Sequence, residues 1–184
     1  MNPIKIVGFT GSLRKGSYNL AALRAAKELL PNDAELEILD LSAIPFFNED
    51  LEGGELPAPV TDFMRKITEA DALLIATPEY NFSIPPVLKN ALDWASRNPA
   101  RLFSNKPTAI MSASMGPLGG ARVQYHLRQV GVVLNMRLIN QPEVFISSVH
   151  EKVDANGNLV DKETREHISS LINKLIDLVK AQKA

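Results

Sequence analysis

Short apolar runs alternate along this chain with longer segments whose apolar residues recur every three or four positions. Residues 4–10 show no polar alternation apart from Lys5, as expected for a strand buried on both faces of a parallel sheet. Residues 19–30 follow with an apolar stripe at helical spacing, which Pro31 ends. This alternation is typical of βαβ units, in which parallel strands are joined by crossover helices.

The same pattern continues to the end of the sequence. Further strands are predicted at residues 35–41, 72–76, 108–112 and, with an interruption at Pro142, at 136–139 plus 144–146; further helices are predicted at 60–70, 86–96, 120–130 and 162–181. Strands and helices in strict alternation predict a flavodoxin-like α/β fold, a three-layer α/β/α sandwich around a five-stranded parallel sheet of order 2-1-3-4-5. Since 184 residues suit one domain, we expect residues 1–184 to form a single flavodoxin-like domain rather than two.

A proline-rich segment, residues 42–59, separates the second predicted strand from the next helix. Loops of about 18 residues are uncommon inside compact domains and are often functional or disordered. A mobile surface excursion is one interpretation. The apolar run at residues 44–47 instead favours packing against another part of the protein.

Composition narrows the possible chemistry. The chain has no cysteine, which excludes disulfides, thiolate nucleophiles, iron–sulfur clusters and cysteine zinc sites. Its 20 Lys and Arg against 21 Asp and Glu give a formal charge of -1, so nucleic acid is not expected as a partner. No apolar stretch approaches the ~20 residues of a membrane span, and the first residues do not resemble a signal peptide. We therefore expect a cytoplasmic protein without membrane insertion.

Ligand chemistry is expected at the carboxyl ends of the strands, at the switch point between the first and third strands of such a sheet. The loop after the first strand, TGSLRKGSYN at residues 10–19, runs directly into a helix. Its backbone N–H groups and the positive helix end suit a phosphate, as does the planar fork of Arg14. Side-chain donors are available from Ser12, Ser17 and Asn19. The alternative is a plain turn in which Ser17 caps the helix.

Other phosphate-binding motifs do not fit this loop. Gly11 and Gly16 have the glycine spacing of a P-loop, but Ser17 stands where that motif needs its lysine. The GxGxxG dinucleotide fingerprint is absent, and so are the paired acids that end the first strand of receiver domains. Neither a nucleoside triphosphate nor a Rossmann-bound dinucleotide is expected.

Two further loops suit a flat heterocycle. TPEYNFSIPP, residues 77–86, combines three prolines that fix the backbone with the aromatic faces of Tyr80 and Phe82. SASMGPLGGAR, residues 112–122, contains three glycines that let the backbone approach a ligand closely. Each loop also has a structural interpretation, either a rigid turn with its aromatic residues in the core or a tight turn before a helix. Three such loops at one end of a sheet favour a ligand site.

The segments GSLRKGSYN, TPEYNFSIPPVLKNALDW and SMGPLGGARVQYHLRQ together resemble the NAD(P)H-dependent FMN reductase family, near its bacterial chromate and quinone reductases. The resemblance extends over residues 5–152, and the run from PEYN to LKNALDW is its most specific part. It implies an FMN cofactor and NADPH or NADH as co-substrate, in a ping-pong two-electron transfer to a quinone or a similar small acceptor such as chromate, an azo compound or flavin. It implies neither a metal nor a catalytic side chain.

The resemblance also gives each matched residue a role in holding the cofactor. Around the FMN phosphate and ribityl chain it places Ser12, Arg14, Ser17, Tyr18 and Asn19. Against the isoalloxazine ring it places Pro78, Glu79, Tyr80, Asn81 and Phe82. Near the pyrimidine end of the ring it places Ser114, Met115 and Gly116. Backbone N–H groups of the last two loops would stabilise negative charge on the reduced ring.

The resemblance also predicts a homo-oligomer, and two alternatives to the reductase function stay open. Family members are homodimers or homotetramers whose neighbouring subunit completes the pocket, which would bring Asn48, Glu49 and Asp50 near the partner's pocket. Two other functions stay open: a flavodoxin-type electron carrier that does not oxidise nicotinamide, and a non-catalytic module on the same fold. Carriers are usually strongly acidic, so the charge of -1 and the SLRKGS loop argue against the carrier.

Overall fold

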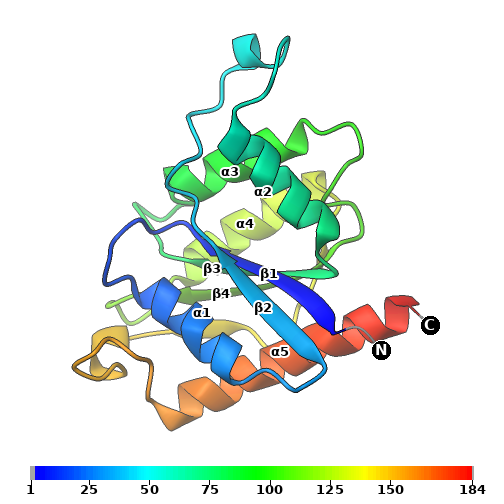
Figure 1. Ribbon diagram of the computed structural model, residues 1–184. Coiled ribbons are helices and arrows are strands. Elements are labelled where there is room, and N and C mark those ends of the chain that lie inside the picture. Colours follow the sequence, from blue (N-terminus) through cyan, green and yellow to red (C-terminus); the bar gives the residue numbers. More distant parts are fainter. Residues whose placement is uncertain (1–2, 184) are drawn as a thin grey trace.

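The computed structural model describes residues 3–183 as a central sheet between two layers of helices (Figure 1). The strands are β1 (Ile4–Thr10), β2 (Ala34–Leu39), β3 (Ala72–Thr77), β4 (Pro107–Ala113), β5 (Arg137–Leu138) and β6 (Val144–Ile146). The helices are α1 (Tyr18–Glu28), α2 (Ala58–Glu69), α3 (Pro86–Ser96), α4 (Ala121–Val133) and α5 (Lys162–Lys183), with 3₁₀ turns η1 (Glu49–Leu51) and η2 (Val149–Glu151). Every predicted strand and helix is present. Helix α2 begins before Val60, because Pro59 lies in its first turn, where a missing N–H costs nothing.

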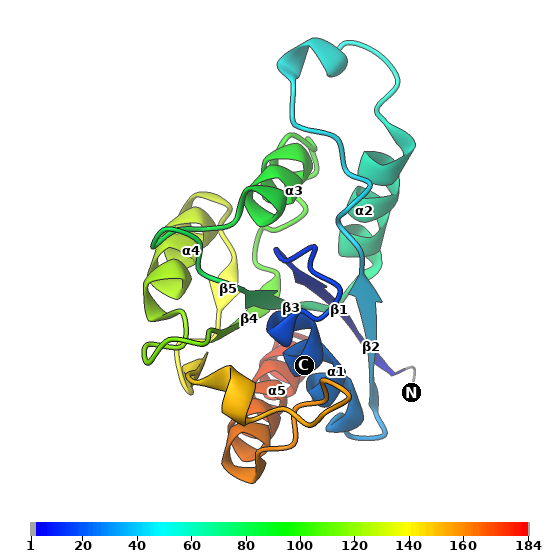
Figure 2. The same cartoon turned by 90° about the vertical axis from the view of Figure 1, so that its left-hand side faces the viewer.

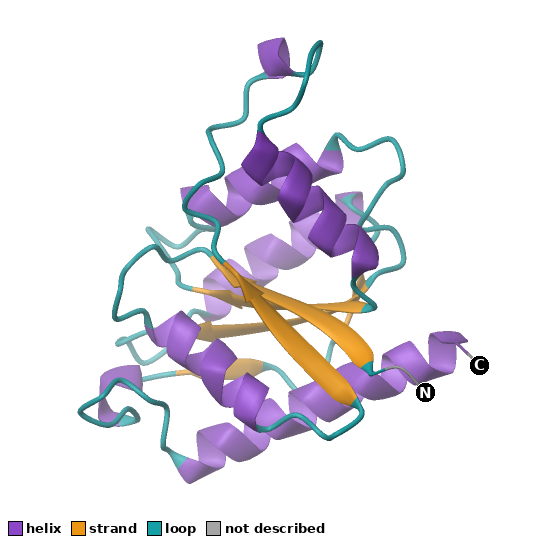
Figure 3. Cartoon of the chain, viewed as in Figure 1, coloured by secondary structure: helices purple, strands orange, loops and turns teal. Residues whose placement is uncertain are grey.

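The strand order β2-β1-β3-β4-β5 confirms the predicted order, and each of these pairs is parallel. β5 pairs with the start of β4 and β6 with its end, so the two short strands are halves of one edge strand. The interruption falls at Pro142, as predicted, and the Gln141–Pro142 peptide bond is cis. The flavodoxin-like three-layer sandwich is therefore confirmed (Figure 3).

Each face of the sheet is buried by its own set of helices. On one face α1 and α5 pack over Leu74 and Met111, and on the other α2, α3 and α4 pack over Ile75 and Ile110 (Figure 2). Since neighbouring residues of a strand point to opposite faces, β3 is buried along its whole length. Trp94 of α3 is fully buried in the second cluster and belongs to the core.

The register of the strands brings the three candidate loops together. Thr10 at the end of β1 pairs with Ala76, and Thr77 at the end of β3 pairs with Ser112. The loops that follow β1, β3 and β4 therefore lie together at the carboxyl ends of the strands. Open parallel sheets bind their ligands at these ends.

The long segment between β2 and α2 forms an arm that projects from the body beyond α2 and α3 (Figure 1). Its base is tied to α3, because the carbonyl of Pro45 accepts hydrogen bonds of 2.8 Å from Asn90 Nδ2 and from Trp94 Nε1. The Phe47 ring packs edge-on against Trp94 with the ring centroids 5.0 Å apart. Phe46 is 80% exposed. The packing interpretation of the arm thus holds for Phe47 but is wrong for Phe46.

Helix α5, which covers one face of the sheet, begins at a side-chain cap. Asp161 Oδ1 accepts a hydrogen bond of 2.9 Å from the backbone N–H of Thr164 and another from the Thr164 hydroxyl. The hydroxyl bond and then the backbone bond lower the pKa of the Asp161 carboxyl, because both favour its charged form. Folding is thereby coupled to the ionisation of Asp161.

We expect Asp161→Ala to lower the free energy of unfolding by about 1 kcal/mol at pH 7, the usual cost of losing an N-cap. A carboxyl whose pKa is lowered by folding stabilises the fold above its unfolded pKa of about 3.9 and loses this contribution as the pH falls through the folded value. The difference between wild type and variant should therefore shrink in acid. Urea unfolding at several pH values measures it. Asp161→Asn keeps the cap without the charge and should lose less stability at pH 7; a variant Asp161→Ala as stable as wild type would contradict the cap.

Candidate functional site

A cavity of about 450 Å³ opens at the carboxyl edge of the sheet, a size typical of small-molecule sites. The three predicted loops line it, with Ser12, Arg14, Ser17, Tyr18, Asn19, Pro78, Glu79, Tyr80, Ala113, Ser114 and Met115. Among the predicted cofactor residues, Asn81, Phe82 and Gly116 lie outside this lining. The structure therefore brings together residues of all three loops, and Ala113 joins them without having been predicted.

A larger groove, of about 700 Å³, lies along the first halves of β1 and β2, toward the amino ends of the strands. Its charged side chains are mixed, and Lys66 Nζ already pairs with the Glu37 carboxylate at 2.5 Å. None of the three ligand-suited loops reaches it. We assign the candidate site to the smaller cavity because residues of all three ligand-suited loops line it.

The loop after β1 has the features that an anion site requires. The Ser17 hydroxyl oxygen accepts a hydrogen bond of 3.2 Å from Leu20 N–H, so Ser17 caps α1, as the plain-turn interpretation expected. The first turn of α1 contains no acidic residue, which leaves its positive end uncompensated. The Arg14 guanidinium lies over the Tyr18 ring, 4.7 Å from its centroid. A Cβ on Gly16 would stand 3.1 Å from Arg14 Nη1, so glycine leaves room for this guanidinium.

Asn19 has a structural role that the sequence did not predict. Its Nδ2 donates to the Ala113 carbonyl at 3.1 Å, and its Oδ1 accepts from the Ala113 N–H at 2.9 Å. Both hydrogen bonds are buried. The carboxamide therefore ties the start of α1 to the end of β4, and one of its two N–H donors is committed to this link.

The loop after β3 contains a tight two-residue turn. Tyr80 N–H donates to the Ser83 carbonyl at 3.1 Å, and Ser83 N–H donates to the Tyr80 carbonyl at 2.9 Å. The two central residues, Asn81 and Phe82, have φ of 49° and 64°, the sign that a type I′ turn requires. Within residues 3–183, the backbone N–H groups of Asn81 and Phe82 donate to no protein acceptor, which leaves them available to a ligand.

The loop after β4 divides into a ligand-facing part and a structural part. Ser114 N–H donates to the Ile146 carbonyl and Gly116 N–H to Ser114 Oγ, so the predicted set of free N–H groups reduces to that of Met115 among the described residues. Gly119 and Gly120 have φ of 57° and 83°, and a Cβ on either would come within 2.9 Å of neighbouring atoms. The tight-turn interpretation is therefore right for these two glycines.

The side chain of Glu79 extends from the loop after β3 to α4. Its carboxylate accepts a hydrogen bond of 3.1 Å from Val123 N–H and pairs with Arg122 Nη1 at 3.3 Å. The sequence carried no local signal of this contact, because Glu79 and Val123 lie 44 positions apart. Residue spacing does not reveal such pairs unless the strand order is already known.

Other predicted features lie away from the cavity. Asn48, Glu49 and Asp50 are exposed on the projecting arm, where Asn48 Oδ1 accepts from Asp50 N–H at 3.0 Å. In the described part of the chain no three His, Cys, Asp or Glu side chains are grouped so as to hold a metal ion. No helix between residues 3 and 183 is long and apolar enough to cross a membrane.

Comparison with known proteins gives the family. Residues 4–151 match the model of the NADPH-dependent FMN reductase family. NAD(P)H-dependent FMN reductase PA1204 of Pseudomonas aeruginosa is 51% identical over 172 residues, covering 94% of this chain and 93% of that protein. Quinone reductase of Escherichia coli K12 is 38% identical over 183 residues, covering 98% of this chain and 97% of that protein.

A solved structure agrees with these sequence matches. FerB from Paracoccus denitrificans, a flavoenzyme NAD(P)H:(acceptor) oxidoreductase, superposes with a TM-score of 0.88 at 29% identity, over 97% of this chain and 98% of FerB. The family match covers all three loops that line the cavity. The chain therefore belongs to the NADPH-dependent FMN reductase family.

Proposed function

We propose that this chain binds FMN in the cavity and transfers two electrons from NADPH or NADH to a quinone or a similar small acceptor. The observation that carries the proposal is the convergence of an anion-suited loop, a rigid turn and a third loop on one cavity. When bound, FMN supplies the redox chemistry that the side chains lack, by accepting a hydride and giving up two electrons. Overall, NAD(P)H, a proton and a quinone become NAD(P)⁺ and a hydroquinone.

The anion-suited loop fits the phosphate of FMN. The uncompensated N-terminus of α1 and the Arg14 guanidinium offer positive charge, and the Ser12 hydroxyl adds a donor in the same wall. Tyr18 holds the guanidinium over its ring, so less side-chain freedom is lost on binding. This end of the cavity anchors and does no chemistry.

The rigid turn and the third loop fit the isoalloxazine ring. The buried Pro78 provides a fixed wall, and Met115 provides a free N–H donor in the lining. The free N–H groups of Asn81 and Phe82 belong to the adjoining turn, outside the lining, and add donors beside the cavity. Fixed donors need no reorganisation when negative charge develops on a ligand, which is the basis of electrostatic stabilisation in enzymes. The chain thereby orients the ring and favours its reduced state, and no side-chain acid or base is assigned.

The mouth of the cavity suits a flat apolar acceptor. Tyr80, Phe82 and Met115 are 47%, 62% and 60% exposed around it, and exposed apolar groups gathered at a pocket mark a binding surface. Relatives named NAD(P)H:quinone oxidoreductase, such as that of Solanum tuberosum at 47% identity, agree with a quinone. Chromate, a compact dianion, is less well matched to an apolar mouth than a flat aromatic acceptor.

We further infer a homodimer or homotetramer. Besides the residues at the mouth, Leu13, Leu118 and Tyr125 are exposed apolar side chains, whose burial against a second copy of the chain would be favourable. The arm projects away from the body and exposes Asn48, Glu49 and Asp50 (Figure 1), which supports their placement near a partner's pocket. Cytoplasmic location stays a prediction from the sequence.

Purified protein reconstituted with FMN is expected to bleach within seconds when NADPH or NADH is added anaerobically, without a partner enzyme. Adding a quinone should restore the oxidised flavin spectrum. Stopped-flow absorbance with each nucleotide, followed by a panel of acceptors, measures both half-reactions. A flavin that stays oxidised for minutes with both nucleotides would contradict the proposal and favour an electron carrier.

Arg14→Ala should weaken FMN binding about tenfold or more, the loss expected for one charge-assisted hydrogen bond to phosphate. The rate of reduction per bound flavin should stay nearly unchanged, because Arg14 lies at the phosphate end. Quenching of FMN fluorescence on titration into apoprotein gives the dissociation constant.

Lys15→Ala is the matched control, because it removes the same charge from the next residue, which does not line the cavity. It should weaken FMN binding much less. Equal losses in the two variants would indicate a general electrostatic effect and would remove Arg14 from the phosphate site.

A further inference from the structure

The ring-facing turn has a conformation that its sequence does not favour. Type I′ turns need positive φ at both central residues, and Asn-Gly is the preferred pair. Asn81 suits its φ of 49°, but Phe82 holds a φ of 64° with a bulky side chain. Strained residues of this kind persist only where the surrounding structure holds them, and they gather at functional sites.

The contacts that hold Phe82 come from α4. The Arg122 guanidinium stacks over the Phe82 ring, 4.0 Å from its centroid. Arg122 Nη1 also lies 3.3 Å from Glu79 Oε1, so the guanidinium joins two residues of the same loop. We call Glu79, Phe82 and Arg122 the turn clamp.

The clamp is anchored by a backbone hydrogen bond. Glu79 Oε2 accepts from Val123 N–H at 3.1 Å, in the first turn of α4. The N-cap residue of α4 is Gly120, which has no side chain to satisfy that donor, and the first turn contains no acidic residue. Glu79, only 11% exposed, supplies both the missing cap and the negative charge that a helix N-terminus favours.

This arrangement also solves an electrostatic problem. A carboxylate in a loop that faces an electron-accepting ring opposes negative charge on that ring. Here Arg122 and the positive end of α4 compensate the charge of Glu79. The carboxylate can therefore fix the loop without strongly opposing reduction.

We propose that Glu79 is a positioning residue, whose carboxylate caps α4 and, through Arg122, holds the strained turn so that the cavity keeps its shape for the flavin ring. This inference depends on the proposed function only for the identity of the ligand, FMN. Because α4 directly follows the third loop, the clamp also couples the two loops assigned to the ring. Side chains from both loops should then loosen together when Glu79 is lost.

The test compares Glu79→Ala, which removes the cap, with Glu79→Gln, whose amide oxygen still accepts a hydrogen bond. In apoprotein, amide exchange at Val123 and Ser83 should be about tenfold faster in Glu79→Ala and within about threefold of wild type in Glu79→Gln. FMN binding, followed by fluorescence quenching, should weaken about tenfold in Glu79→Ala and be largely rescued in Glu79→Gln. Rescue by glutamine separates capping from a need for negative charge at this position.

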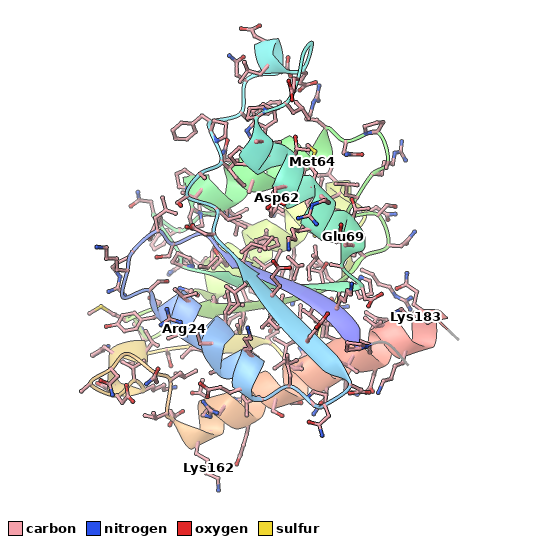
Figure 4. All side chains as sticks on the ribbon, viewed as in Figure 1. Arg24, Asp62, Met64, Glu69, Lys162 and Lys183 are labelled. Atoms are coloured by element: carbon pink, nitrogen blue, oxygen red, sulfur yellow. The ribbon has the colours of Figure 1, made fainter. Side chains whose placement is uncertain are left out.

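Glu69→Ala is the matched control. Glu69 lies at the end of α2 (Figure 4), where it pairs with Arg65 at 3.0 Å in a similar Glu–Arg contact. That end of α2 precedes the start of β3, at the edge of the sheet opposite the cavity. Its removal should change neither amide exchange at Val123 nor FMN binding.

Two results would overturn the inference. The first is a Glu79→Ala variant whose amide exchange and FMN affinity stay within twofold of wild type. The second is a Glu79→Gln variant whose amide exchange and FMN affinity change as much as those of Glu79→Ala. If Glu79→Ala does not fold, Arg122→Ala decides, since it leaves the cap but releases Phe82 and should speed exchange at Ser83 more than at Val123. Wild-type protein that binds no FMN would contradict the proposed function, while the exchange data would still decide the role of Glu79.

Discussion

The two buried hydrogen bonds between Asn19 and the backbone of Ala113 fix the geometry on which the cavity depends. Parallel strands bring three loops to one edge of the sheet, but they do not set how far the first helix stands from the third loop. The Asn19 carboxamide does so, because it satisfies a backbone N–H and a backbone C=O at once. A shorter or apolar side chain would leave both groups buried without a partner, which is costly.

From that fixed point, the loops reach their shapes by local constraints of different kinds. The first loop is set by a helix cap at Ser17 and by the space that Gly16 leaves for Arg14. The second is a two-residue turn between prolines, held from outside by α4. In the third, Gly119 and Gly120 adopt backbone angles and contacts that a side chain would obstruct. The cavity is thus rigid before any ligand arrives, which lowers the ordering cost of binding.

The sequence was sufficient for the elements, the strand order and the three loops, because apolar period and loop chemistry are local properties. It was insufficient for what individual side chains do within the loops. Asn19 and Glu79 line the cavity, but the sequence did not predict that their polar groups bond to Ala113 and Val123, which lie 94 and 44 positions away. Exposure of Phe46 likewise depends on how the arm sits on α3. Such pairings depend on tertiary packing, so they cannot be predicted from a short stretch of sequence.

The absence of cysteine and the contacts of the cavity both indicate that the chain binds and orients a ligand, while the ligand supplies the reactivity. Glu79 and Arg122 neutralise each other, Asn19 is occupied by backbone, and no histidine lines the cavity. What is left facing a ligand is a guanidinium, a helix end, backbone N–H groups and the hydroxyls of serine and tyrosine residues, all of which can donate hydrogen bonds to an electron-rich atom. A chain of this kind can hold a phosphate and an electron-accepting ring in place, and its reactivity comes from the molecule it holds. Changes in the loops should therefore alter affinity and acceptor choice before they alter the type of reaction.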